Sequence, residues 1–257
     1  LKLLTIVLPT TRKSSRRPTS DMSAAAAGEG DIGGGVPELR YFDCPGKGQA
    51  IRLACKLGGV SIRDVRLSRP DFEALRADGA LPFGQLPVLD LPGDGGERLA
   101  QAGAILRLVG KWGGLYPADP IEACRVDMLL ELEGDLMLPM LLTVYPTRLG
   151  LPDFASEDEL IARRRSLLEA PQGPLARRLL QLDAALARAG FGAADIDPWA
   201  AGTPRPSIAD CALVPRLVYL ASGELKGVPE DVLDAYPKVG ALVARFKRLP
   251  EVQEIGV

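Results

Sequence analysis

The stretch PFGQLPVLDL, residues 82–91, places a proline directly before a short run of β-forming residues. Pro87 has no N–H to donate to a sheet ladder, so it belongs at the start of a strand rather than inside one. An X-Pro bond can also be cis, which turns the preceding backbone outward. In isolation, a trans proline that marks a strand boundary is the simpler explanation, so the surrounding elements have to decide.

The flanking segments alternate between strand and helix patterns. Pro45 can occupy the first turn of a helix that Gly58 and Gly59 end, and Pro70 and Asp71 open a second, shorter helix. A Gly-rich turn joins two strands of a hairpin, and an amphipathic helix follows. In order, the segments are 38–42, 44–59, 62–68, 70–78, 87–91, 97–100 and 101–114. This β-α-β-α-β-β-α order predicts a compact α/β domain over 38–112.

The second half of the chain has helical periodicity only. The segment GGLYPADP, 113–120, has the composition of an interdomain linker. Residues 121–257 contain neither a strand pattern nor an internal repeat, which predicts an α-helical bundle. Within it, Ser207 and Asp210 form a capping box, which is a structural feature and not a catalytic one. The predicted fold class is therefore α/β plus all-α.

Residues 1–37 are expected to form a leader outside both domains. Residues 1–20 carry five basic side chains and no acidic ones, which suits a transit peptide. The first methionine is Met22, so read-through of untranslated sequence explains the segment equally well. We expect a cytoplasmic protein, or an organellar one if 1–21 is a genuine transit peptide. No run of 18 apolar residues occurs, which predicts no membrane span.

Composition excludes several kinds of chemistry. The net charge is −2 with no basic stripe, so we expect no nucleic-acid partner. The chain has no histidine, which removes Ser-His-Asp and Cys-His catalysis and all His-ligated metal sites. The four cysteines fit neither a zinc site nor a disulfide framework, which indicates a reducing compartment. Catalysis must then use Tyr, Cys, Lys, carboxylates or backbone dipoles.

Six motifs carry a resemblance to a known family. They are RYFDCPGKGQAIR (40–52), LPFGQLPVLDL (81–91), QAGAILRLVG (101–110), GLYPADP (114–120), RVDMLLELEGDL (125–136) and SIADCAL (207–213). Their order and spacing resemble those of the cytosolic glutathione S-transferases, most closely the tyrosine-type sigma and pi classes. The resemblance implies an N-terminal thioredoxin-like domain, a C-terminal helical bundle and a homodimer. It also implies glutathione as co-substrate, with no metal and no bound cofactor.

Tyr41 and Cys44 are rival candidates for the group that manages the sulfur chemistry. The resemblance assigns Tyr41 as the catalytic residue, because a phenol stays protonated at neutral pH and can donate to a thiolate. Cys44 precedes a proline that opens a helix, where a thiol becomes more acidic. A Cys44-dependent enzyme would be a glutathione thiol transferase or disulfide reductase. In the tyrosine reading, Cys44 lines the pocket of a hydrophobic electrophile.

The resemblance also assigns a glutathione-binding set. Lys47 replaces an arginine, Phe72 a tryptophan and Ala102 a serine that meets the γ-glutamyl carboxylate, and these departures predict weaker glutathione binding. The expected set is Tyr41, Lys47, Phe72, Arg76, Gln85, Leu86, Pro87, Gln101, Ala102 and Asp135, the last reaching the neighbouring subunit's glutathione.

Two further aromatic residues complete the expected site. Tyr145 is expected beside Cys44 at the hydrophobic substrate, and Phe83 is expected to dock into the partner subunit. The predicted function is conjugation of glutathione to hydrophobic electrophiles, with isomerase or peroxidase side activity open. A non-catalytic dimerisation module with the same fold is the remaining alternative.

Overall fold

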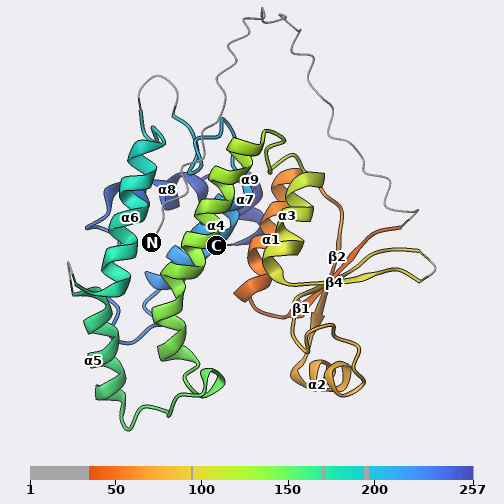
Figure 1. Ribbon diagram of the computed structural model, residues 1–257, viewed down its shortest axis with the longest axis horizontal. Helices are drawn as coiled ribbons and strands as arrows, with labels where there is room; N and C mark the ends of the chain where they lie inside the picture. The colour runs from red at the N-terminus through yellow and green to blue at the C-terminus, as the bar shows by residue number, and fades with distance from the viewer. Residues whose placement is uncertain (1–34, 94, 170–171, 194–196, 257) are drawn as a thin grey trace, which may run out of the picture.

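The computed structural model describes residues 35–93, 95–169, 172–193 and 197–256. In Figure 1 a small sheet and a bundle of helices flank a central pair of helices. The predicted leader, 1–37, lies outside the described residues except for 35–37. The elements confirm the predicted fold class, an α/β half followed by an all-helical half.

The sheet has four strands in the order β2-β1-β3-β4. β1 pairs parallel with β2 and antiparallel with β3, and β4 pairs antiparallel with β3. Side chains alternate across β1, so Leu39 and Tyr41 are buried on one face. The strands are β1 Glu38–Phe42, β2 Arg63–Leu67, β3 Val88–Asp90 and β4 Arg98–Ala100.

Three helices complete the first domain, and one begins later than expected. The α-helix predicted from Pro45 starts at Gln49, after a 3-10 turn at Gly46–Gly48. Gly46 has a φ of +38°, outside the range of a right-handed helix, so Pro45 lies before the α-helix and not in its first turn. The helices are α1 Gln49–Gly58, α2 Arg69–Ala77 and α3 Ala102–Trp112.

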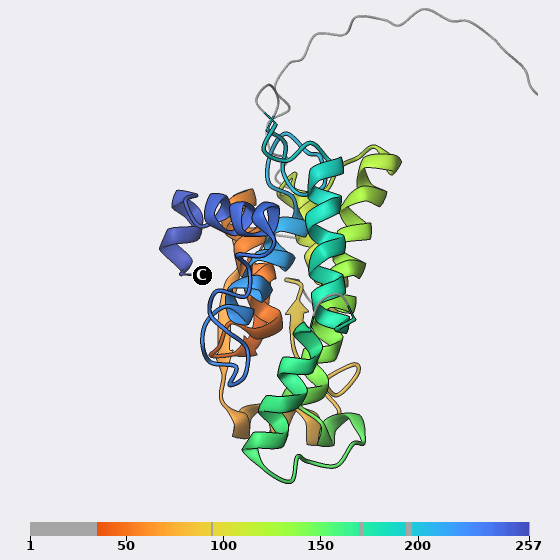
Figure 2. The same ribbon diagram turned by 90° about the vertical axis from the view of Figure 1, so that its left-hand side faces the viewer.

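The second domain contains only helices in its described residues. α4 and α6 run alongside each other, α8 packs against α6 and α7, and α9 packs against α1 of the first domain (Figures 1 and 2). Among the described residues, no helix is both long enough and apolar enough to cross a bilayer. The elements are α4 Pro120–Val144, a 3-10 turn η2 Thr147–Leu149, α5 Glu157–Leu168, α6 Pro174–Arg188, α7 Ile208–Leu220, α8 Pro237–Phe246 and α9 Pro250–Ile255.

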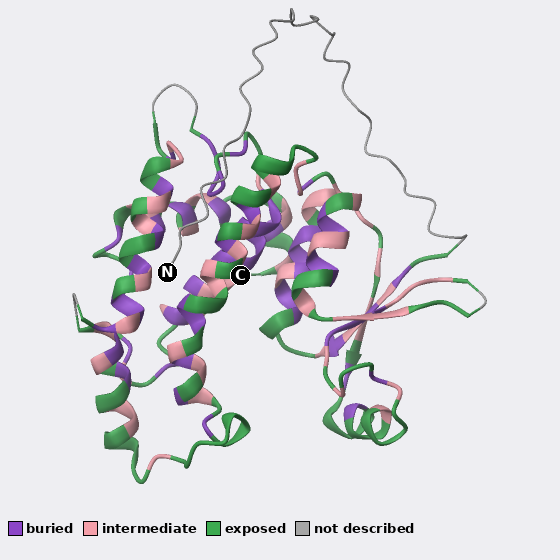
Figure 3. Ribbon diagram, viewed as in Figure 1, coloured by how far each residue is buried: buried purple, intermediate pink, exposed green. Residues whose placement is uncertain are grey.

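α7 joins the two domains through one continuous hydrophobic core. Every residue from Ile208 to Val214 is buried, and the helix packs against α1 and α3 of the first domain as well as α4 and α8. The Ile208 N–H also donates to the Leu115 carbonyl at 3.0 Å. Figure 3 shows buried residues in the sheet and in the helices of both halves, and one cluster of buried side chains contains Leu39 of β1 together with Val126 of α4. The domains are therefore held together by apolar packing over a broad contact.

The predicted capping box at the start of α7 is present and buried. The Ser207 N–H donates to Asp210 Oδ2 at 2.8 Å, and the Ala209 N–H donates to Ser207 Oγ at 3.2 Å. The Ala200 N–H donates to the other carboxylate oxygen of Asp210 at 3.1 Å, so this side chain also ties down the preceding loop. Burial raises the pKa of Asp210, and these hydrogen bonds act in the opposite direction.

We predict that removing this cap destabilises the protein more than removing its exposed counterpart at α2. Ser207→Ala should lower the free energy of unfolding by about 1–2 kcal/mol, because a buried cap leaves its amides without water. Ser68 caps α2 by the same motif at the surface, so Ser68→Ala is the matched control and should cost about 0.5–1 kcal/mol. Urea unfolding followed by circular dichroism measures both. Equal losses would show that burial of the cap is unimportant.

Candidate active site

Two adjoining hollows lie where the first domain meets the second. The sheet-edge hollow is lined by Lys47, Phe83, Gln85, Leu86, Pro87, Ala100, Gln101 and Ala102. The interdomain hollow, about 220 Å³ in volume, lies between the β1–α1 loop and helices α3, α4 and α7. Lys47, Gln101 and Ala102 line both. The structure therefore brings six of the predicted glutathione-binding residues together from three separate segments.

Two segments that line the sheet-edge hollow have unusual backbone conformations. The Leu86–Pro87 peptide bond is cis, so the simpler explanation of a trans proline does not hold here. Opposite it, Gln101 has a φ of +73°, and it is the only residue other than glycine with a positive φ in the described part of the chain. Such a conformation costs roughly 1–3 kcal/mol and is found preferentially at binding sites.

The N-terminus of α3 offers backbone donors to this hollow. The first hydrogen bonds of the helix run from the Ala104 and Ile105 N–H groups to the Gln101 carbonyl, both at 3.0 Å. The N–H groups of Ala102 and Gly103 precede them and are the unpaired amides of a helix start. With the positive end of the helix dipole and with Lys47 in the same hollow, this corner favours a carboxylate.

Tyr41 lies beneath the loop that walls the interdomain hollow. Its side chain is buried, and its hydroxyl oxygen accepts a hydrogen bond from the Lys47 N–H at 3.0 Å. A hydroxyl that accepts in this way still has its own proton to donate. Burial raises the pKa of Tyr41, and the Lys47 N–H opposes this only in part. The phenol is therefore a neutral donor at physiological pH.

Two glycines let the loop approach the tyrosine this closely. A β-carbon added at Gly46 would lie 2.4 Å from the Tyr41 hydroxyl oxygen, and one added at Gly48 would lie 2.7 Å from the ring. Any other residue at these positions would displace either the ring or the loop. Because the loop covers it, Tyr41 is not part of the lining of either hollow.

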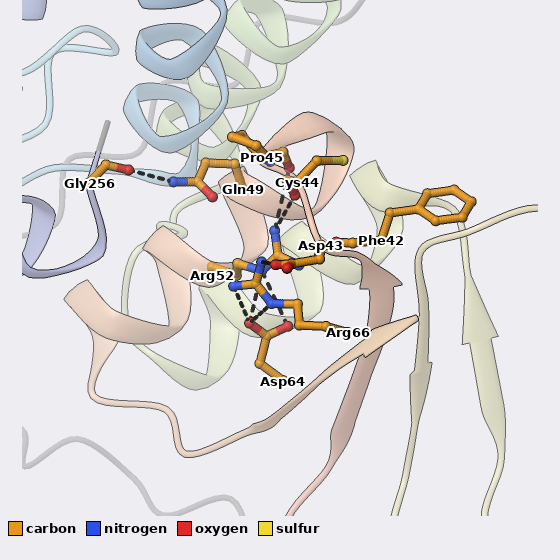
Figure 4. A network of polar contacts seen from close by, with 9 residues as sticks. All are labelled: Phe42, Asp43, Cys44, Pro45, Gln49, Arg52, Asp64, Arg66 and Gly256. Atoms are coloured by element: carbon orange, nitrogen blue, oxygen red, sulfur yellow. Dashed lines mark hydrogen bonds and ion pairs between the residues drawn. The ribbon is translucent and has the colours of Figure 1, made fainter. Parts of the chain in front are cut away.

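Arg52 holds this loop in place (Figure 4). Its side chain is 5% exposed, and its Nε donates to Asp64 Oδ2 of β2 at 3.0 Å. Nη1 donates to the Cys44 carbonyl at 2.8 Å and Nη2 to the Phe42 carbonyl at 3.3 Å. We did not assign Arg52 a role from the sequence, although a charged residue inside the apolar run IRLAC was a signal that it is buried with partners.

Cys44 is exposed and makes its hydrogen bond through the backbone. Its carbonyl accepts from Arg52, and its sulfur points away from the guanidinium in Figure 4. The α-helix starts only at Gln49, so the thiol does not sit directly before the first turn of α1 as the sequence suggested. This weakens the helix-dipole argument for a reactive Cys44.

Two predicted residues on α2 lie outside both hollows. Phe72 is buried in a small cluster with Leu81 and Val88, and its ring packs edge-to-face on Phe42 at 5.3 Å. Its bulk is thus used for packing between α2 and the sheet. Arg76 is exposed, and its Nη1 lies 3.6 Å from Oε2 of Glu73 on the same helix. Neither side chain lines a hollow, although Leu86 packs against the cluster that contains Phe72.

Two predicted residues on and after α4 are also outside the hollows. Asp135 pairs with Arg178 of α6 at 2.9 Å, so within this subunit it faces the bundle. Tyr145 is 42% exposed at the end of α4, with the Arg148 guanidinium 4.2 Å from its ring centre. The binding of Asp135 to the neighbouring subunit's glutathione and the contact of Tyr145 with the hydrophobic substrate stay predictions.

Sequence reasoning missed a charged pair in the wall of the interdomain hollow. Arg216 of α7 donates through Nε to Glu133 of α4 at 2.9 Å, and both line the hollow. Burial raises the pKa of Glu133, while the charges of Arg216 and Lys47 lower it. The two partners are 83 residues apart, so no local pattern connects them.

The arrangement combines four features. The start of α3 favours a carboxylate, and the backbone of Leu86 lies beside the cis-proline. The phenol of Tyr41 is neutral, and the Arg216 guanidinium is in the wall of the interdomain hollow. Such a set can bind a peptide-like anion and stabilise a developing negative charge. A larger hollow, about 360 Å³ between α5 and residues 227–229, contains none of the predicted residues. In the described part of the chain, no group of three or more Cys, Asp and Glu side chains is placed to hold a metal ion.

Comparison with known sequences supports the resemblance. No family model matches the chain. It is 41% identical over 100 residues to glutathione S-transferase 1 of Ascaris suum, covering 39% of this chain and 46% of the relative. It is 29% identical over 221 residues to glutathione S-transferase A3 of Mus musculus, covering 86% and 88%. The chain spans about half the length of the first curated relatives that it matches, 46% and 61%.

Solved structures extend the similarity over both domains. The glutathione S-transferase from Ascaris lumbricoides covers 86% of this chain with 95% of its own, at 27% identity and a TM-score of 0.67. A glutathione S-transferase of the hookworm Necator americanus, described as monomeric, covers 85% with 95% of its own at 22% identity and a TM-score of 0.65. In sequence and in fold, the chain is similar to glutathione S-transferases.

Proposed function

We propose that the protein is a glutathione transferase and that Tyr41 stabilises the glutathione thiolate. The observation that carries this proposal is the convergence of Lys47, Gln101 and Ala102 with the Leu86–Pro87 edge in one groove, where the Lys47 backbone N–H donates to the Tyr41 hydroxyl. No local sequence pattern would assemble these residues, because they come from three segments that only the tertiary fold brings together.

Each part of the groove suits one part of glutathione. In the proposed complex, the γ-glutamyl carboxylate binds at the start of α3, where the Ala102 and Gly103 amides are unpaired. The peptide-like backbone of the cysteinyl unit pairs with the backbone of Leu86, beside the cis bond. The sulfur then lies toward the Tyr41 hydroxyl, which donates a hydrogen bond to the thiolate and keeps its proton.

The electrophile would enter the interdomain hollow. The thiol proton passes to solvent, the thiolate sulfur forms a bond to the electrophilic carbon, and the leaving group departs with its electron pair. Ala50, Leu106 and Pro215 supply an apolar part of the wall, which suits the hydrophobic electrophile that we expect. The proposal retains the expected cytoplasmic location and the homodimer.

Cys44 carries the second candidate function, a thiol transferase or disulfide reductase. It is favoured by one observation, the free and exposed thiol in the loop after β1, three residues beyond Tyr41. In that mechanism the Cys44 thiolate attacks the S–S bond of a substrate's mixed disulfide with glutathione, binds the glutathione sulfur and expels the substrate thiolate. A second glutathione thiolate then attacks the Cys44–glutathione disulfide, which frees Cys44 and forms glutathione disulfide. We rank it below the tyrosine mechanism because the thiol is not directly before the first turn of α1.

Tyr41→Phe and Cys44→Ser separate these two mechanisms. We predict that Tyr41→Phe lowers the kcat/KM for conjugation by roughly 10- to 100-fold, the value of a lost hydrogen bond to a charged group. Cys44→Ser should leave conjugation within about twofold. Both are measured with a chromogenic electrophile and, separately, with a glutathione mixed disulfide. If only the cysteine variant loses conjugation, Tyr41 is not the catalytic residue.

Ala102→Ser tests the carboxylate corner. A serine at this position would add a hydroxyl donor to the γ-glutamyl carboxylate, so we predict a Kd for glutathione at least about tenfold lower. Ala104→Ser, on the exposed side of the same helix, is the matched control and should leave the Kd unchanged. Calorimetric titration with glutathione compares the three proteins. Equal affinity of the Ala102→Ser variant and the parent would argue against γ-glutamyl binding here.

Phe83 tests the homodimer. Its ring is 63% exposed at the rim of the sheet-edge hollow, as expected for a side chain that a partner subunit covers. We predict that Phe83→Ser shifts the protein from dimer to monomer in sedimentation experiments. Leu180→Ser, at another exposed apolar side chain on α6, is the control and should remain dimeric. A monomeric parent would refute the dimer and with it the reading of a non-catalytic dimerisation module.

A further inference from the structure

The pair formed by Glu133 and Arg216 leaves most of the guanidinium available to a ligand. Arg216 uses only Nε in its 2.9 Å bond to Glu133 Oε1, and the described residues contain no other hydrogen-bond partner for it. Both side chains are mostly buried, with exposures of 24% and 20%, and both line the interdomain hollow. A cation anchored at Nε in this way keeps Nη1 and Nη2 free at the wall.

The pair lies against the loop that holds Tyr41. Gly46 and Lys47 line the same hollow, and the Lys47 N–H bonds the Tyr41 hydroxyl. Burial raises the pKa of Tyr41, and the Lys47 N–H and the positive charge of Arg216 act in the opposite direction. A thiolate bound at that hydroxyl lies within the field of the same charge.

The other charges around the hollow are weaker candidates for this role. Arg107 of α3 is engaged by Asp127 at 2.8 Å and by Glu131 at 3.2 Å, so its charge is compensated. Lys47 is on the loop itself, and its contact with Tyr41 is through the backbone. The titratable and charged groups that line the hollow or act on Tyr41 are, by element, Tyr41, Cys44 and Lys47 of β1 and its loop, Arg107 of α3, Glu131, Glu133 and Tyr145 of α4 and its end, and Arg216 of α7. Arg52 of α1 also lies 5.7 Å from the centre of the Tyr41 ring, and its charge is paired with Asp64.

We propose that Arg216, anchored by Glu133, provides the positive charge that stabilises the glutathione thiolate, and that Glu133 limits that stabilisation. This inference rests on the proposed function and assigns the second domain a part in it. Arg216 is a positioning residue, because it acts on the sulfur through its field and through the Tyr41 hydroxyl. The thiol proton goes to solvent, and the chain itself gains or loses no proton.

The test is the pH titration of the bound thiol, followed by the ultraviolet absorption of the glutathione thiolate. Arg216→Gln should raise the pKa of the bound thiol by roughly 0.5–1 unit, or about 3- to 10-fold less thiolate below that pKa. Glu133→Gln keeps an oxygen for the Arg216 Nε but removes the negative charge, so it should lower the same pKa. Two substitutions at one contact would then act in opposite directions, which a general disturbance of the fold does not produce.

Two controls complete the experiment. Arg216→Lys retains the charge and should leave the thiol pKa close to that of the parent. Lys226→Gln removes an equal charge from the exposed pair with Glu157, away from both hollows, and should not shift it. If Arg216→Gln titrates like the parent, or if the Arg216→Gln and Glu133→Gln shifts have the same sign, the inference is overturned. If the parent itself shows no bound thiolate, the proposed function fails first, so the two failures are distinguishable.

Discussion

The buried guanidinium of Arg52 is the constraint on which the site depends. It connects the side chain of Asp64 on β2 to the carbonyls of Phe42 and Cys44, and so joins α1, the sheet and the β1–α1 loop at one point. Burying a cation costs several kcal/mol unless it is paired and hydrogen-bonded, and here the carboxylate and the carbonyls offset that cost. Because these partners lie on separate elements, the loop has one position that satisfies all of them. That position brings the Lys47 N–H to the Tyr41 hydroxyl.

The second domain also positions part of the site. α7 packs on α1 and α3 and is buried along most of its length, so the wall that it contributes to the interdomain hollow is as firmly placed as the first domain itself. The capping box at Ser207 and Asp210 fixes where this helix starts. From that start, Arg216 lies two turns further along, facing Glu133 of α4 and the hollow. A site shared by two domains in this way does not need a hinge to assemble it.

Particular residues show how far sequence reasoning reached. Three features were found as expected: the strand start at Pro87, the strand at 38–42 and the helix cap at Ser207. All three depend on local backbone preferences. The grouping of Lys47, Gln101 and Ala102 followed from the resemblance to a family. Phe72 and Arg76 were expected in the same group, yet α2 turns the first toward the sheet and the second toward solvent. The direction of a side chain on a short helix depends on packing, which a motif match does not contain.

The amino-acid sequence by itself determined the order and type of the elements, because periodicity, caps and prolines act over a few residues. It also indicated that the chemistry must rely on a phenol or a thiol, since the chain has no histidine. Only the tertiary structure decided what surrounds Tyr41: the Arg52 network, the glycine contacts and the Glu133–Arg216 pair. These interactions join groups 5 to 83 residues apart. Their strength depends on shared burial, which exists only once the chain has folded.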